Sequence, residues 1–245
     1  MRIALLTDVH ANLAALQAVL RHAEEDGPLD QVWCMGDLVG YGPQPSECLT
    51  VLRGYDLRAV AGNHDRAATG DLDTSAFNPA AAEAAGWTET HITNDDRAFL
   101  RELPEVRVEG EMTLVHGSLR DPVWEYLFDP RAARGHLDRQ DTPYSVCGHT
   151  HIPLLFEEAP GRSSPLMATL AHGDRIELGE RRLVINPGGV GQPRDGDPRS
   201  AYGLLDTAAR TVDLFRVEYD ITATQRAMED AGLPERLITR LARGK

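Results

Sequence analysis

The sequence predicts an α/β fold with two stacked β-sheets and helices outside them, organised as one domain over residues 1–245. In the first third of the chain, apolar runs typical of buried strands alternate with helical patterns, which predicts a parallel sheet. From about residue 153 onward the pattern changes to short strands and turns. No low-complexity linker, internal repeat or break in composition separates the two parts.

The first elements follow the order strand, helix, strand, helix, strand. Residues 2–7 are a continuous apolar run, as expected for a strand buried on both faces. A helix is predicted over 12–25, because Leu13, Leu16 and Leu20 line one side and Gly27-Pro28 stops it. The next predicted elements are a strand at 31–35, a short helix at 46–52 and a strand at 57–61.

The remaining elements are less regular. Residues 64–103 are Ala-rich and predicted to be helical up to Pro104. Strands are predicted at 112–115 and 144–147, and the segment at about 118–140 between them, with Trp124, Tyr126 and Phe128 beside several charges, is expected to be a long surface excursion. The C-terminal part has predicted strands at 153–158, 181–186, 200–206 and 211–220, the last two as an antiparallel hairpin, then helices at 221–231 and 234–243.

Composition excludes several classes of protein. With 42% hydrophobic and 26% charged residues, the chain is an ordinary globular protein. No window approaches the roughly 18 apolar residues of a membrane span. The apolar run at 3–6 stops at Asp8, too early for a signal peptide, so a cytoplasmic location is expected by default. The net charge of −13 argues against a stable nucleic-acid partner, and the three cysteines are expected to be reduced thiols.

A polar cluster follows nearly every predicted strand of the first sheet. The clusters are TDVH (7–10), GD (36–37), GNHD (62–65), HG (116–117) and GHTH (148–151). Ligands bind at the carboxyl ends of strands in open α/β sheets, so we expect the five clusters to converge. In an extended chain the imidazoles of His149 and His151 face the same way, as two metal ligands would. The glycines of these clusters are expected to let the backbone turn sharply.

The residue types indicate a metal site. Asp, Asn and His without Cys suit Mn, Fe, Zn or Ni and argue against a thiolate-rich zinc site. A lone His on a strand is more often structural than a ligand, but five clusters in one order favour metal binding. Seven candidate ligands are too many for one ion, which points to two metals. The histidines outside the clusters are expected to be surface or structural residues: His22, His91, His136 and His172.

The order D-x-H, G-D, G-N-H-D, H-G, G-H-x-H over residues 8–151 resembles the calcineurin-like metallophosphoesterases. The segment NPGGVGQPRDGDPRSAYGLLD (186–206) is similar to the closing segment of small bacterial and archaeal members. At Gly189 many relatives are expected to have serine. The resemblance implies a four-layer α/β/β/α sandwich of two mixed sheets packed face to face.

The resemblance also implies a dinuclear site. One metal takes Asp8, His10 and His151, and the other takes Asn63, His116 and His149, while Asp37 bridges both. The ions are two divalent transition metals, manganese first, with iron, zinc or nickel as alternatives.

The implied activity is that of a metal-dependent phosphoesterase. A metal-bridging hydroxide attacks phosphorus, His64 is the general acid, and Asp65 orients its ring and favours its protonated form. Arg194 is expected to clamp the phosphate, unless it is a surface arginine, and Tyr41 to contact the substrate.

The expected substrate is a small phosphodiester, because the acidic chain disfavours large nucleic acids. The alternatives are a phosphomonoesterase or protein phosphatase and a dinucleoside polyphosphate hydrolase. A non-catalytic binding scaffold with the same fold is disfavoured, because all seven ligands and His64 are present. The oligomeric state stays open.

Overall fold

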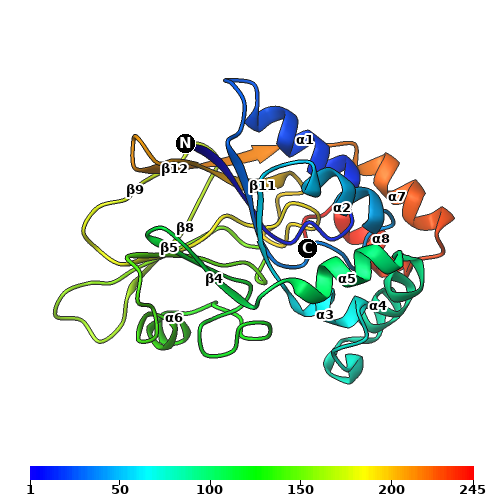
Figure 1. The fold of residues 1–245 in the computed structure, drawn as a ribbon, viewed down its shortest axis with the longest axis horizontal. Helices are drawn as coiled ribbons and strands as arrows, with labels where there is room; N and C mark the ends of the chain where they lie inside the picture. Colours follow the sequence, from blue (N-terminus) through cyan, green and yellow to red (C-terminus); the bar gives the residue numbers. More distant parts are fainter.

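Two six-stranded β-sheets packed face to face form the centre of the computed structural model, which describes residues 1–245 (Figure 1). The first sheet has the strand order β3 (Leu57–Val60), β2 (Gln31–Met35), β1 (Arg2–Leu6), β11 (Ser200–Asp206), β12 (Thr211–Val217) and β9 (Arg175–Glu177). The second has the order β4 (Val106–Glu109), β5 (Met112–Val115), β6 (Tyr144–Val146), β10 (Leu183–Asn186), β7 (Leu154–Glu157) and β8 (Leu166–Thr169).

Both sheets are mixed, as predicted. Strands β1, β2 and β3 are parallel, and β11 and β12 form the predicted antiparallel hairpin beside β1. In the second sheet β5, β6 and β10 are parallel, while β4, β7 and β8 run antiparallel to their neighbours. The pairing of β1 with β11 therefore joins the two ends of the chain in one sheet.

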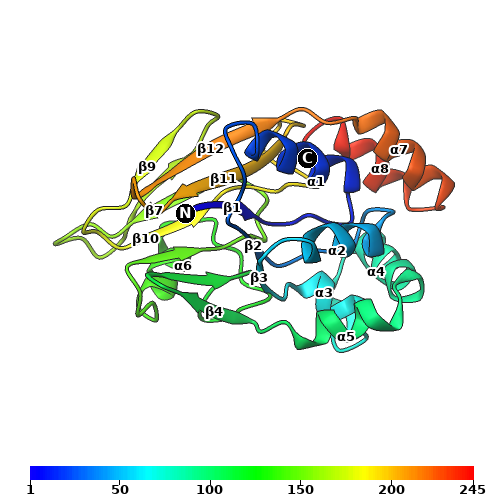
Figure 2. The same ribbon diagram turned by 45° about the horizontal axis from the view of Figure 1, so that its top comes forward.

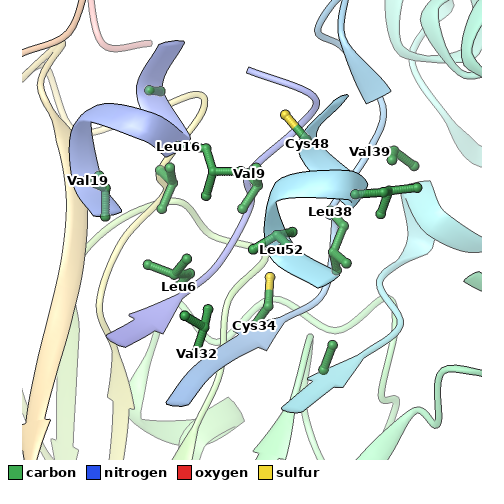
Figure 3. Packing of buried hydrophobic residues seen from close by; sticks show 14 of the residues in the cluster. Leu6, Val9, Leu16, Val19, Val32, Cys34, Leu38, Val39, Cys48 and Leu52 are labelled. Atoms are coloured by element: carbon green, nitrogen blue, oxygen red, sulfur yellow. The ribbon is translucent and has the colours of Figure 1, made fainter. Parts of the chain in front are cut away.

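Three layers of buried side chains hold the sheets and helices together. Ile3, Leu5 and Trp33 of the first sheet meet Leu114 and Val146 of the second in the space between the sheets. The opposite face of β1 and β2 packs against helices α1 (Leu13–Ala23) and α2 (Pro45–Arg53), which Figure 3 shows from close by. Helix α6 (Pro130–Leu137) covers the outer face of the second sheet. The result is the expected four-layer sandwich.

The Ala-rich segment is largely helical, as predicted, and is divided into three α-helices. They are α3 (Asn63–Ala68), α4 (Pro79–His91) and α5 (Asn94–Glu102). Asn78 and Thr93 each accept a hydrogen bond from a backbone N–H of the following turn, so each starts a new helix. Helices α7 (Ile221–Asp230) and α8 (Glu235–Leu241) close the chain beside α1 (Figure 2), and their buried residues form one cluster with Ala81 and Ala84 of α4.

The sequence pattern missed three strands and one helix. Strand β4 alternates between exposed and half-buried residues, β8 is exposed throughout, and β9 has three residues, so none shows a continuous apolar run. Helix α6 lies within the segment interpreted as a surface excursion and begins after Asp129, which caps it. None of the helices combines the length and hydrophobicity that crossing a bilayer requires.

Candidate metal centre

The five polar clusters meet where the carboxyl ends of strands from both sheets lie together. Their His and Asp donor atoms form groups of three within 4.8 Å of one another. The clusters after β1, β2 and β3 belong to the first sheet, but those after β5 and β6 belong to the second. The expectation that one sheet carries all five is therefore wrong, because the face-to-face packing brings two sheet edges to the same place.

Each of four histidine rings is oriented by a backbone carbonyl. The contacts are His10 Nδ1 to Val39 O at 3.2 Å, His116 Nδ1 to Met35 O at 2.9 Å, His151 Nδ1 to Gln192 O at 2.6 Å and His149 Nε2 to Trp124 O at 3.1 Å. A carbonyl only accepts, so in each ring this nitrogen is the N–H donor. The other ring nitrogen then presents a lone pair. In protein metal sites, such a hydrogen bond fixes the tautomer and the orientation of the ligating histidine.

Asp8, His10 and His151 form the first group of donor atoms. Asp8 Oδ1 lies 3.1 Å from His151 Nε2 and 3.9 Å from His10 Nε2, and the two Nε2 atoms are 3.2 Å apart. Asp8 Oδ1 is buried and has no hydrogen-bond partner. The other carboxylate oxygen, Oδ2, accepts from the backbone N–H of His149 at 3.1 Å and from the Thr7 hydroxyl. That second oxygen fixes the carboxylate, and Oδ1 stays free to bind.

The second group surrounds His116. Its Nε2 lies 2.9 Å from His149 Nδ1, 3.2 Å from Asn63 Oδ1 and 3.4 Å from Asp37 Oδ2. The same Asp37 oxygen lies 3.6 Å from His10 Nε2 of the first group. Asp37 Oδ1 accepts from the backbone N–H of His64 at 2.9 Å. Asp37 therefore directs one oxygen between the two groups while the other is held by the backbone.

The donor set fits divalent metal ions. Lone pairs of buried imidazoles face each other and carboxylate oxygens at close range, an arrangement that a cation between them would stabilise. Burial raises the pKa of Asp8 to about 7, which shows how poorly its charge is otherwise compensated. Burial also lowers the pKa values of His10, His149 and His151, which favours the neutral form that binds metals. Carboxylate, amide and imidazole together suit transition metals.

The backbone at these residues is strained. Positive φ angles occur at Asp8 (54°), His10 (49°), Asp37 (52°), His149 (66°) and His151 (59°), which are five of the seven predicted ligands. For a residue with a Cβ, the left-handed region costs about 1–2 kcal/mol. Such strain persists where the surrounding structure enforces it, and it clusters at functional sites.

The glycines of the clusters act differently from expectation. Only Gly36 has a positive φ, whereas Gly62, Gly117 and Gly148 do not. A Cβ at Gly62 would overlap Asp37 Oδ1, and one at Gly148 would overlap the Thr7 hydroxyl. The sharp backbone conformation is thus carried by the predicted ligands themselves, and these glycines provide close approach.

His64 lies beside the donor groups and lines a pocket. Its ring centroid is 4.2 Å from that of Tyr41 and 4.8 Å from that of Phe77. His64 Nδ1 has no hydrogen-bond partner. The ring also lies with His10 and Asp37 in a third group of donor atoms within 4.8 Å of one another.

Asp65 does not orient the His64 ring, so this expectation is wrong. Its oxygens accept from the backbone N–H groups of Val39 at 3.2 Å and Gly62 at 2.9 Å, and it thereby caps helix α3. Burial lowers the pKa of His64, so the protonated form is not favoured either. Asp65 instead ties the backbone just after the GD cluster to the start of helix α3.

The pocket beside the donor atoms has a volume of about 290 Å³ and contains both predicted substrate residues. The Arg194 guanidinium carbon lies 5.7 Å from the centroid of the Tyr41 ring. Sequence reasoning missed the pocket residues Phe77, Trp124 and Tyr126. The aromatic residues at 124–128 were the available signal, but their charged neighbours led to a surface interpretation.

Gly189 lies against one of the predicted ligands. A Cβ there would be 3.1 Å from His151 Cβ, so a serine requires His151 to shift by a few tenths of an ångström.

The chain is similar to known proteins over its whole length. Residues 1–210 match the calcineurin-like phosphoesterase superfamily domain. The chain is 36% identical to an uncharacterized protein of Methanocaldococcus jannaschii, over 99% of this chain and 98% of that one. It is 27% identical to a symmetrical bis(5'-nucleosyl)-tetraphosphatase of Erwinia tasmaniensis over 68% of this chain, and it spans only 61% of that relative. The crystal structure of a metallophosphoesterase from Sphaerobacter thermophilus superposes with a TM-score of 0.91 at 44% identity, over 100% of this chain and 99% of that one.

Proposed function

The chain belongs to the calcineurin-like phosphoesterase superfamily and is a metal-dependent phosphoester hydrolase, and we propose that it hydrolyses small phosphodiesters at a centre of two metal ions. The observation that supports this most strongly is the set of four carbonyl-oriented imidazoles beside Asp8 and Asp37. Residues 1–245 are proposed to act as one domain, since β1 pairs with β11 from the far end of the chain.

In this proposal Asp8, His10 and His151 hold one metal, and Asn63, His116 and His149 hold the other, while Asp37 binds both. The position of Asp37 Oδ2, 3.4 Å from His116 Nε2 and 3.6 Å from His10 Nε2, supports the bridging role. When bound, two such ions polarise phosphoryl oxygens and lower the pKa of water toward neutrality. Manganese is the proposed metal, and the donor set also suits iron, zinc and nickel.

The protein's own groups are proposed to bind the phosphate and protonate the leaving group. Arg194 lines the pocket, and its planar guanidinium can donate to two phosphate oxygens at once. Tyr41 supports Arg194 from beneath its guanidinium. His64 is the proposed proton donor, because its ring lines the same pocket and its Nδ1 is free of hydrogen bonds. Burial disfavours its charged form in the free protein, so the negative charge of a bound phosphate would have to raise its pKa.

The substrate is proposed to be a small diester. The net charge of −13 opposes binding of a long polyanion, and a pocket of about 290 Å³ suits a small group beside the phosphate. A dinucleoside polyphosphate is the second candidate, on the strength of the similarity to the Erwinia tasmaniensis enzyme. Phosphomonoesters and phosphoproteins are further alternatives. A non-catalytic scaffold is disfavoured, because all the proposed ligands and His64 are present.

The test combines metal counting with a substrate panel. Protein freed of metal and reconstituted with Mn²⁺ is expected to hold two ions per chain. Its kcat/KM should be highest on small diesters, compared with phosphomonoesters and dinucleoside polyphosphates. One ion per chain at saturation would contradict the dinuclear centre. A preference for monoesters would contradict the proposed substrate but leave the metal centre intact.

A further inference from the structure

Arg194 carries a positive charge into the pocket that no carboxylate pairs with. The next two acidic residues along the chain, Asp195 and Asp197, form ion pairs with Arg216 and Arg199 instead. Arg194 forms no ion pair, although the chain as a whole has a net charge of −13. Its guanidinium therefore stays available to an anion that enters the pocket.

A neutral side chain holds the guanidinium of Arg194 in place. Its Nη2 donates to Gln192 Oε1 at 3.0 Å, and its Nε donates to the same oxygen at 3.3 Å. A guanidinium only donates, so the amide atom that faces it is the oxygen. This contact uses the Nε–Nη2 edge of the guanidinium and leaves the end formed by Nη1 and Nη2 for a ligand.

Gln192 is also connected to the proposed metal ligands. It is 2% exposed, and its backbone carbonyl accepts from His151 Nδ1 at 2.6 Å. The Arg194 N–H donates to His151 O at 3.3 Å, and the Gly191 N–H donates to Asp8 O at 2.9 Å. The side chain of Gln192 thus starts from a backbone whose position relative to two proposed ligands is fixed.

A glutamine at this position lowers stability in one respect. Gln192 Nε2 is buried and has no hydrogen-bond partner, a penalty that an apolar side chain would avoid. A glutamate would bind the guanidinium more strongly but would neutralise its charge. Only the neutral amide both holds the guanidinium and leaves its positive charge uncompensated.

We propose that Gln192 is a positioning residue, which holds Arg194 so that the Nη1–Nη2 end of its guanidinium is ready to bind the phosphate of the substrate. This rests on the proposed function, because it places the phosphate beside Arg194. Without the amide, the arginine side chain would lose rotamer freedom only when phosphate binds, which weakens binding. The effect of Gln192 on phosphate binding should therefore exist only while Arg194 is present.

Calorimetric titration of inorganic phosphate into the Mn²⁺-reconstituted protein tests this without turnover. Gln192→Leu should weaken phosphate binding about 2- to 13-fold, the usual range for one hydrogen bond. Gln192→Glu should weaken it further, because a carboxylate pairs with Arg194 and repels phosphate. In an Arg194→Ala background, Gln192→Leu should have no additional effect. Gln31→Leu is the matched control: its Oε1 accepts from Trp33 Nε1 at 2.9 Å, at the end of β2 far from Asp37.

Metal content and steady-state kinetics separate positioning from a structural role. All these variants should hold as much metal as the wild type, because the carbonyl that orients His151 belongs to the backbone. On small diesters, Gln192→Leu should raise KM by the same factor and leave kcat nearly unchanged, as expected for a contact that the bound substrate and the transition state make equally. A lower kcat together with a lower metal content would assign Gln192 to the metal centre and overturn the proposal.

Two binding results would also overturn it. They are an unchanged phosphate affinity in Gln192→Leu, and an equal loss of affinity with and without Arg194. If Arg194→Ala binds phosphate as tightly as the wild type, the arginine has no role and the proposal falls with it. If the affinities follow the expectation but no diester is hydrolysed, the proposed function fails and the positioning role stands.

Discussion

The Nε2 atoms of His10 and His151 lie 3.2 Å apart, while the Nδ1 atom of each ring faces a backbone carbonyl. Neither Nε2 can donate to the other, so two lone pairs are held against each other in a buried site. The metal-free protein should therefore be clearly less stable than the loaded one. Removing metal with a chelator should lower Tm by about 5–10 °C relative to protein with metal at about 100 times its Kd. Calorimetric scans check this, and equal Tm values would contradict it.

Asp37→Asn should remove both metals and leave the fold intact. The amide oxygen can still accept from the His64 N–H, but the group facing His10 and His116 loses its charge. We expect elemental analysis to find far less than one ion per chain, with a metal-free Tm close to that of the wild type. Asp95→Asn, at an exposed position of α5, is the matched control. A variant that still holds one ion tightly would argue against a bridge.

His64→Ala should leave the metal content unchanged and slow the reaction by roughly 10²- to 10⁴-fold on substrates with an alkoxide leaving group. The loss should be much smaller on nitrophenyl esters, because nitrophenolate departs without a proton. Parallel kinetics on the two substrate types check this. An equal loss on both would favour a positioning role for His64. Loss of metal would make it a ligand, in line with its place beside His10 and Asp37.

Gly191→Ala should destabilise the protein by about 1–3 kcal/mol through overpacking. A Cβ at Gly191 would overlap the Val9 carbonyl, in the loop between Asp8 and His10. Gly86→Ala is the opposite control: it lies in α4 with nothing within 4 Å of its Cβ position, so stability should rise by about 0.5–1 kcal/mol. Denaturant unfolding of both variants measures the change in the free energy of unfolding. If Gly191→Ala left this free energy unchanged, the loop that contains Val9 would have to move to make room for the new Cβ.

His136 should give the fold a pH dependence that is independent of the metals. Burial lowers its pKa to about 4, and its Nδ1 accepts from the Leu119 N–H while its Nε2 faces the Ser145 hydroxyl. Between pH 6.5 and 4 the unfolded chain binds a proton here and the folded chain does not, so stability falls as pH falls. The loss is on the order of 3 kcal/mol across this window.

The stability–pH profile of metal-free His136→Gln should be flatter than that of the wild type over this range. His91→Gln, at an exposed position, should keep the wild-type slope. Parallel profiles for wild type and His136→Gln would contradict the assignment.

The N-terminal half of the fold was predictable because its strands are continuous apolar runs separated by clear stop signals. The exposed strand β8 and the short strand β9 leave no such pattern, because β8 buries no side chain and β9 buries only Ile176. The sequence pattern did not predict that β5 and β6 belong to the second sheet. Sheet membership depends on long-range pairing of strands, which the local pattern of apolar residues does not reveal.

In the candidate site, too, some features were predictable from the sequence and others were not. Convergence of the five clusters was predictable from where strands end. The carbonyl partners of the histidines were not, because Val39 and Trp124 contribute backbone oxygens that any residue type has. Asp65 was misassigned because adjacency to His64 in sequence does not decide which way a side chain turns at a helix start.

The pairing of β1 with β11 also sets the order of events during synthesis. The strand that presents Asp8 and His10 leaves the ribosome first, but one of its two neighbours in the sheet is residues 200–206. At usual elongation rates of about 5–20 residues per second, roughly 10–40 s separate the two strands. His151 also emerges long after Asp8, so a nascent chain offers only an incomplete and mobile set of ligands. If the proposed ligands hold the metals, metal uptake is therefore expected to be a late event, completed when nearly the whole chain has been made.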